Sequence, residues 1–268
     1  MTTLQAVNEL LAAIGEPPVT ALDTGGVSEQ AEAETWLDAE RTKILMRGWN
    51  CNVDPEVELA VPDTRINVSG GSGTFTFGET VTESVSGATG TFKYTATGSP
   101  DQMYLVRLTG TFTGGQTLTG GTSGATKTGG TYAAVTTAKH ALDSNWLTVL
   151  PADREWQPFA RRGNFLWDPT ELSFNWTAPL WVKTYTLLAF TDLPQSLAEY
   201  VARSAAVNFQ RYKKRGSADE AVLMQRAMAA KVMAEREDSE AGRVNLTATA
   251  EARRVKGWRT TFSGGDSL

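Results

Sequence analysis

Apolar residues near the N-terminus recur every three or four positions, which is the spacing of one helix face. They are Leu4, Val7, Leu10, Leu11 and Ile14. Thr2 and Gln5 have the spacing of a capping box, in which each side chain binds the other residue's backbone N–H. Gly15 suits a left-handed helix end, and the prolines that follow prevent continuation. The pattern therefore predicts a helix that ends at Ile14.

Three further segments show the same helical spacing. A helix is predicted from Ser28, with Glu29 and Glu32 in its first turn, to about Arg47. Another is predicted from Pro194 to Gly216. The last opens with a capping box at Ser217 and runs to about Ser239, and its apolar members are Val222, Leu223, Met228, Val232 and Met233. Because both helix pairs have short connections, we expect four antiparallel helices to form a bundle.

The middle of the chain has a different pattern, since about half of residues 70–137 are Gly or Thr. Residues 73–89 read GTFTFGETVTESVSGAT and residues 110–126 read GTFTGGQTLTGGTSGAT, with an offset of 37 residues. Short alternating runs between glycines are typical of hairpin strands. A flexible linker is the alternative, but the regularly placed aromatic and aliphatic residues favour a small β-sandwich or β-roll built from two related units.

Residues 146–191 alternate in short runs separated by turn dipeptides, which predicts about four more strands. The expected fold class is α+β: an antiparallel helical bundle with a small β-sheet, plus an inserted all-β domain. We expect a discontinuous host domain of residues 1–63 and 143–241, an insert at residues 64–142, and a polar C-terminal arm at residues 242–268.

Composition limits the chemistry available to the chain. Its 268 residues carry a net charge of −5, which argues against a general nucleic-acid coating protein. Cys51 is the single cysteine, so neither an intrachain disulfide nor a cysteine-based metal cage is possible. We expect Cys51 to be a small buried hydrophobe. The N-terminus lacks the basic start of a secretory signal, and no stretch reaches the length of a membrane span.

The sequence offers little for catalysis. His140 is the only histidine, and its surroundings indicate a solvated linker residue rather than a general base. The acidic groups Glu235/Glu237/Asp238 and Asp153/Glu155 lie in strongly polar runs. No glycine-rich phosphate loop precedes a helix. We predict no catalytic residue, no metal and no cofactor, and an enzyme such as a wall hydrolase remains the least favoured class.

Basic residues gather near the ends of the last two predicted segments. Arg211, Lys213, Lys214 and Arg215 lie at a helix end, where cations complement the helix dipole. Arg253, Arg254 and Trp258 lie in the polar C-terminal segment. We favour contacts with neighbouring subunits or another protein over DNA binding for these residues. The same two alternatives, protein contacts or DNA binding, apply to Arg161 and Arg162.

Two motifs stand out in the segment before the Gly/Thr-rich region. The first is the run LQAVNELLAAIGEPPV at residues 4–19, whose terminator contains Ile14, Gly15, Glu16, Pro17 and Pro18. This run is similar to the opening of the tail tubular protein A family of short-tailed phages. About thirty residues later, Arg47, Gly48, Trp49 and Asn52 match a second family element. The family also closes with two helices, and the predicted pair here agrees with that pattern, because Pro194 precedes its first helix and Gly216 ends it. The Gly/Thr-rich insert is the departure from the family pattern. We expect Trp49 to pack in a core junction.

The resemblance implies a virion tail protein, made in the host cytoplasm, that acts as a head-to-tail adaptor. Such a subunit would form a homo-oligomeric ring of about twelve copies. Portal protein would bind one side and the tail nozzle, tail tubular protein B, the other, with genome DNA passing through the lumen. A binding module, whose β-insert recognises a host glycan or decorates the tail, is the alternative.

Overall fold

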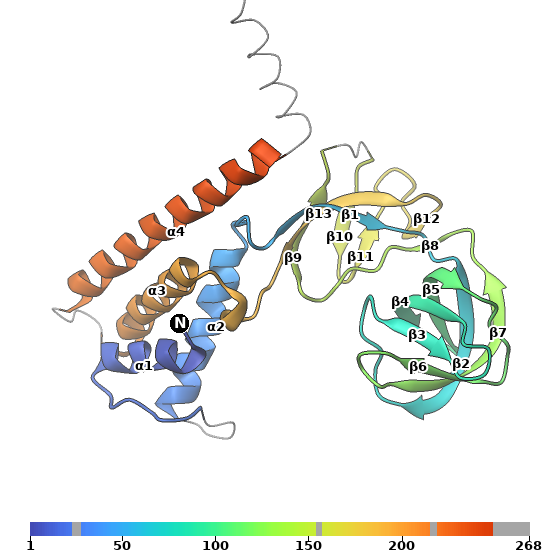
Figure 1. Cartoon of the computed structure of the whole chain (residues 1–268), viewed down its shortest axis with the longest axis horizontal. Helices are drawn as coiled ribbons and strands as arrows, with labels where there is room; N and C mark the ends of the chain where they lie inside the picture. Colours follow the sequence, from blue (N-terminus) through green and yellow to red (C-terminus); the bar gives the residue numbers. More distant parts are fainter. Residues whose placement is uncertain (23–27, 154–156, 215–218, 249–268) are drawn as a thin grey trace, which may run out of the picture. The chain divides into compact units, whose positions relative to one another are not determined.

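The computed structural model describes residues 1–22, 28–153, 157–214 and 219–248. It divides the chain into two compact units, of which the first joins Met1–Val53 to Tyr185–Leu268 and the second is Asp54–Thr184 (Figure 1). The first unit therefore contains both ends of the sequence. The second unit is a single continuous segment between them.

The first unit is helical, and the predicted helices are all present in its described residues. They are α1 (Thr3–Ile14), α2 (Glu29–Leu45), α3 (Gln195–Lys213) and α4 (Glu220–Ala248), with a short 3-10 turn η1 (Phe190–Asp192) before α3. Helix α3 packs against the other three helices, and α1 also packs against α2. Its face is correspondingly apolar, with Val201, Ala205 and Phe209 fully buried. Helix α3 is thus the centre of this unit.

The helix ends follow the local sequence signals. The capping box of α1 is confirmed, because the Thr2 side chain accepts from the Gln5 backbone and the Gln5 side chain accepts from the Thr2 backbone. Ser28 caps α2 in the same way through the Ala31 N–H. Helix α4 continues to Ala248, beyond the end predicted at Ser239. The capping box predicted at Ser217 lies outside the described residues.

Six strands of the second unit close into a β-barrel in the order β2-β5-β4-β3-β6-β7, and all their pairings are antiparallel. Closure occurs because β2 pairs with both β5 and β7. A closed barrel leaves no unpaired sheet edge, which is where sheets otherwise aggregate. The strands are β2 (Thr64–Ser72), β3 (Thr80–Glu83), β4 (Thr89–Ala96), β5 (Asp101–Thr109), β6 (Thr117–Gly120) and β7 (Thr126–Ala134).

The barrel consists of two copies of one three-stranded unit. Strands β5, β6 and β7 begin 37 residues after β2, β3 and β4, so the sequence repeat extends over every strand of the barrel. The buried core repeats with it, and the pairs are Ile66/Met103, Val68/Leu105, Val81/Leu118 and Ala88/Ala125. Gly78 and Gly115 repeat a left-handed backbone, with φ of 80° and 81°. The duplication therefore produces an internally symmetric barrel.

Two buried carboxylates hold equivalent loops of the two copies. Glu83 accepts hydrogen bonds from Ser86 and Thr113, and Glu79 accepts them from their repeat partners, Ser123 and Thr76. Both side chains are almost fully buried. Burial alone would raise the pKa of each carboxyl group, but the hydrogen bonds outweigh it and lower the pKa. The carboxylates act as structural anchors inside the barrel.

Short sheets complete the second unit. One sheet has the order β1-β13-β9, and β10–β11 and β12–β8 form two antiparallel pairs. Leu59, Trp176, Leu180 and Val182 belong to their shared core. The strands are β1 (Val53–Leu59), β8 (Ala138–Lys139), β9 (Trp146–Pro151), β10 (Ala160–Arg162), β11 (Phe165–Trp167), β12 (Asn175–Trp176) and β13 (Leu180–Thr186).

The expectation for His140 is wrong, because this residue is buried rather than solvated. Its Nε2 lies 3.1 Å from the Ala178 carbonyl oxygen, and its ring lies beside Trp176. Desolvation lowers the pKa of His140 to about 4, so the ring is neutral at physiological pH. His140 is therefore a packed core residue.

The predicted fold class is wrong as well. The described residues are mostly β structure, with a closed six-stranded barrel, rather than a helical bundle with a small sheet and a sandwich or roll insert. The physical reason is that the strands of both repeat copies pair with one another around a common core instead of forming two hairpin layers. The predicted insert of residues 64–142 falls inside the second unit, and its boundaries stay a prediction. No helix among the described residues has the length and apolar character needed to cross a membrane.

Candidate functional site at the end of helix α2

The Arg47-Gly48-Trp49 motif follows α2 directly and turns the chain away from the helix. Gly48 has φ of +77°, a left-handed conformation that favours glycine. A Cβ atom added there would lie 2.6 Å from the Tyr185 ring. Both the backbone conformation and this close approach therefore require glycine at position 48.

Trp49 is buried, as expected of a core junction. Its indole Nε1 donates at 2.9 Å to the Ile44 carbonyl, which also accepts from the Arg47 backbone N–H at the end of α2. Its ring packs on Tyr200 of α3, with centroids 6.2 Å apart. The Arg47 guanidinium lies over the Trp49 ring at 5.5 Å and forms an ion pair with Glu235 of α4 at 2.5 Å. The motif thus links α2 to α3 and α4.

Asn52 is the polar centre of this junction and is 2% exposed. Its Oδ1 accepts from the Trp49 backbone N–H at 2.8 Å. Its Nδ2 donates to two backbone carbonyls, Leu45 at the end of α2 and Thr186 at the end of β13, each at 3.0 Å. The backbone N–H of Thr186 returns a bond to the Asn52 carbonyl. One buried amide therefore joins segments 134 residues apart in the sequence.

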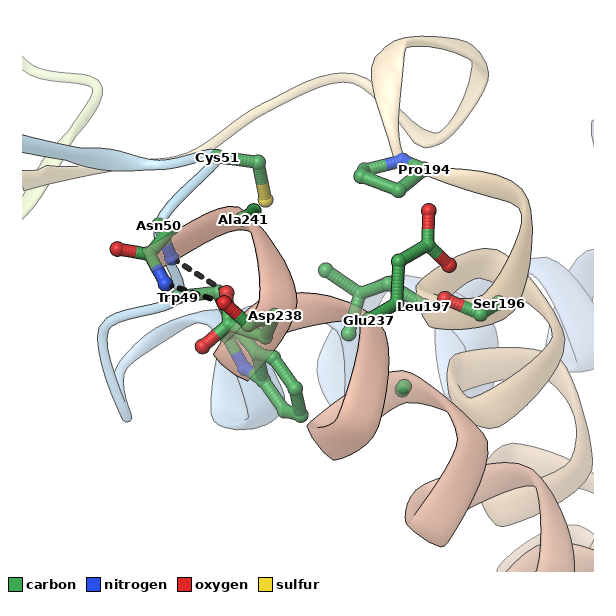
Figure 2. A pocket seen from close by; sticks show the side chains of 10 residues that line it. Trp49, Asn50, Cys51, Pro194, Ser196, Leu197, Glu237, Asp238 and Ala241 are labelled. Carbon is green, nitrogen blue, oxygen red and sulfur yellow. Dashed lines mark hydrogen bonds between the residues drawn. The ribbon is translucent and has the colours of Figure 1, made fainter. Parts of the chain in front are cut away.

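A pocket of about 180 Å³ opens beside this junction (Figure 2). Trp49, Pro194 and Leu197 contribute apolar surface, and Glu237 and Asp238 contribute carboxylates from α4. Asp238 is held in place, because its Oδ1 and carbonyl oxygen each accept a 2.7 Å hydrogen bond from Asn50. The pocket is small and carries negative charge at its edge.

Cys51 also contributes to this pocket, and the expectation that it is buried is wrong. Burial of part of its surface and the nearby Asp238 raise the pKa of the Cys51 thiol. A raised pKa disfavours the thiolate, which is the nucleophilic form. The surroundings of Cys51 therefore do not favour its nucleophilic form.

The terminator of α1 is explained by its geometry. Gly15 has φ of 78°, and the N–H groups of Gly15 and Glu16 return to Ala12 and Leu11. Ile14 is buried, whereas Glu16, Pro17 and Pro18 are exposed. Sequence reasoning missed Asn8, whose side chain makes two hydrogen bonds with the Val19 backbone, at 3.0 and 2.8 Å. Asn8 thereby clamps the segment after the prolines onto α1.

Two of the described basic residues at the end of α3, Arg211 and Lys213, form ion pairs within the chain. Arg211 binds Glu220 at 2.6 Å, and Lys213 binds both Glu29, at 2.6 Å, and Glu32. These hydrogen-bonded pairs raise the pKa of Lys213. Lys214 is exposed near Gly15. Their predicted contacts with other subunits stay a prediction.

The other predicted positions have separate outcomes. Pro194 is the residue directly before α3, as expected from its fixed φ. Arg215, Gly216, Arg253, Arg254 and Trp258 lie outside the described residues. Of the acidic residues considered for catalysis, Glu235 accepts a hydrogen bond from Arg47, and Asp238 accepts one from the Asn50 backbone N–H. Glu155 is outside the described residues.

The junction motifs coincide with a match to a known family. A family model described as tail tubular protein matches residues 4–102 and 133–256. The chain belongs to this tail tubular protein family. It is therefore a structural component of a phage tail. A comparison with curated proteins gives no match.

The family match includes part of the β-barrel. The first three-stranded copy of the barrel, β2 to β4, lies within the matched residues. The unmatched residues, 103–132, are instead most of the second copy. The bounds of the predicted insert, residues 64–142, stay a prediction.

Proposed function

We propose that this tail tubular protein is a ring-forming adaptor that joins the portal to the tail nozzle and surrounds the DNA exit channel. The observation that carries the proposal is the family match, which includes residues of both compact units. The two motifs of the resemblance to tail tubular protein A support it. Their residues build the junction of α2 with α3 and α4 and the clamp on α1, so they maintain a helical unit suited to packing between subunits.

The proposed partners are further copies of the chain, portal protein on one side and tail tubular protein B on the other. Genome DNA would pass through the lumen without specific binding. The net charge of −5 supports a channel that does not hold DNA tightly. The ion pairs of Arg211 and Lys213 support this too, because these cations already have carboxylate partners.

Negative-stain imaging of the purified chain, alone and mixed with its cognate portal, tests the proposal. We expect closed rings, because identical head-to-tail interfaces close when the rotation between subunits divides a full turn, and the resemblance to tail tubular protein A implies about twelve copies. Rings stacked on portal particles would support the adaptor role. Particles that stay monomeric in the presence of portal would contradict it.

A second candidate function is glycan recognition by the second unit. One observation favours it: a groove of about 700 Å³ that combines the rings of Phe77, Tyr94 and Phe165 with polar side chains such as Asp101 and Asn164. Sugars are bound by such combinations of aromatic faces and polar groups. Saturation-transfer NMR of the full chain with host surface polysaccharide tests it. Absence of transfer, or transfer unchanged by Phe165→Ala, would remove this candidate.

A further inference from the structure

Helix α4 carries large apolar side chains on a face that the described residues of its unit leave largely exposed. Met224, Met228 and Val232 are spaced four residues apart, so they form one stripe along the helix, which we call the α4 stripe. Their exposed fractions are 38%, 59% and 62%. Large side chains exposed together on one helix face mark an interaction surface.

The opposite face of α4 shows that the stripe is additional to the packing of the unit. Ala230 and Ala234 are 3% and 2% exposed, and α4 packs against α3. Small residues therefore face inward and the large ones face outward. A helix that is apolar on two faces is typical of one buried on both sides.

Helix α2 presents a surface of complementary shape, which we call the α2 hollow. Glu32, Thr35, Trp36 and Ala39 lie at the spacing i, i+3, i+4 and i+7, and with Tyr212 they surround a hollow of about 420 Å³. Trp36 and Tyr212 form one wall, with ring centroids 5.5 Å apart. Thr35 and Ala39 are small, so they leave space for larger side chains from another helix.

The charges of the two surfaces are complementary as well. Helix α2 contains five acidic residues (Glu29, Glu32, Glu34, Asp38 and Glu40) and two basic ones (Arg41 and Lys43). Glu40 is buried, and Lys213 of α3 binds Glu29 and Glu32, so four acidic residues face three basic ones on this surface and its net charge is negative. The part of α4 that carries the stripe, residues 220–233, contains Glu220 and two basic residues, Arg226 and Lys231. Attraction between surfaces of opposite sign orients a pair of helices and disfavours the pairing of like surfaces.

We infer that the α4 stripe of one copy docks in the α2 hollow of the next copy. This rests on the proposed ring function and assigns its subunit interface. The two surfaces differ, so their contact is heterologous, the type that builds rings, whereas pairing of α4 with α4 would close a dimer and use up the stripe. Large side chains on α4 would enter the space beside Thr35 and Ala39, with Trp36 and Tyr212 as a wall.

A photo-cross-link from the stripe tests this assignment in the full-length chain bound to its cognate portal. Met228→Cys in a Cys51→Ser background is labelled with benzophenone maleimide, illuminated, and analysed by peptide mass spectrometry. The expected product joins the label to the α2 peptide that contains Trp36 in a second copy. A product with α4 of another copy, with residues 249–268, or with portal protein would overturn the assignment.

A charge in the stripe provides a second test. We expect Met228→Asp to lower the fraction of chains in rings at least tenfold, because a carboxylate at the centre of an apolar interface loses its solvation. Val85→Asp is the matched control, since Val85 is exposed in the second unit, and it leaves ring formation unchanged. Circular dichroism checks that both variants fold.

The two tests separate the interface from the proposed function. If the wild-type chain forms rings on portal but Met228→Asp forms them equally well, the interface assignment is wrong and the adaptor proposal stands. If the wild-type chain forms no rings, both are wrong.

Discussion

Replacing Asn52 by alanine removes the amide that connects α2, Trp49 and β13. Three hydrogen bonds disappear, with the Trp49 N–H and with the Leu45 and Thr186 carbonyls. The Leu45 carbonyl keeps a partner, because the Gly48 N–H also donates to it at 3.1 Å. The buried Trp49 N–H and the partly buried Thr186 carbonyl lose the bond that the amide supplies, and each such loss costs about 1–3 kcal/mol.

The expected loss for Asn52→Ala is therefore about 2–6 kcal/mol in the free energy of unfolding of the first unit. Urea titration of the chain at low concentration, followed by tryptophan fluorescence, measures it, because Trp49 lies in the junction. Asn50→Ala is the matched control. Its side chain makes one exposed bond to the Asp238 carbonyl, so its loss stays below about 1 kcal/mol.

The aspartate variant sharpens this test. Asn52→Asp retains an acceptor for the Trp49 N–H but places a carboxylate against two carbonyl oxygens. We expect it to destabilise the chain more than alanine does, since like partial charges replace two bonds. A loss for Asn52→Ala no larger than that for Asn50→Ala, or an aspartate variant as stable as wild type, would refute the role given to Asn52.

Three further predictions concern the turn and the barrel. Gly48→Ala should lower the free energy of unfolding, measured by thermal unfolding, by at least about 2 kcal/mol, because it combines a left-handed φ with a clash against Tyr185. A loss below about 0.5 kcal/mol would contradict this. Leu118→Ala should lower barrel stability by about 2–5 kcal/mol, and an unchanged melting curve would argue against a shared core. Glu83→Gln should destabilise the barrel at neutral pH, because every partner of the carboxylate is a donor. Folding lowers the pKa of Glu83, so the stability that its carboxylate contributes is fully present above the ordinary glutamate pKa of about 4.3 and is lost as the pH falls through the lowered value. The unfolding curves of wild type and variant should therefore converge at low pH. A difference that stays constant with pH would contradict the prediction.

Local signals predicted the helices well. The capping box at Thr2 and the glycine turn at Gly15 depend on residues only a few positions apart, so the sequence contains all the partners. The repeat of 37 residues likewise predicted two related β units. Closure into a barrel depends on pairing between β2 and β7, more than fifty residues apart, and no local pattern specifies it.

The junction at the end of α2 likewise depends on residues that are far apart in the sequence. The Arg47-Gly48-Trp49 motif was recognisable, but the role of Asn52 depends on Thr186, which the sequence gives no reason to place beside it. The exposure of His140 and Cys51 was predicted wrongly for the same reason: both are single residues whose surroundings come from distant segments. On α4, helical spacing predicted apolar positions without showing that Met228 and Val232 face outward.

Native mass spectrometry of the full-length chain with its cognate portal tests the central claim most directly. We predict a closed ring of the chain on the portal, because heterologous contacts close into rings, and the resemblance to tail tubular protein A implies about twelve copies. A chain that remains monomeric with portal present at equal concentration would contradict it.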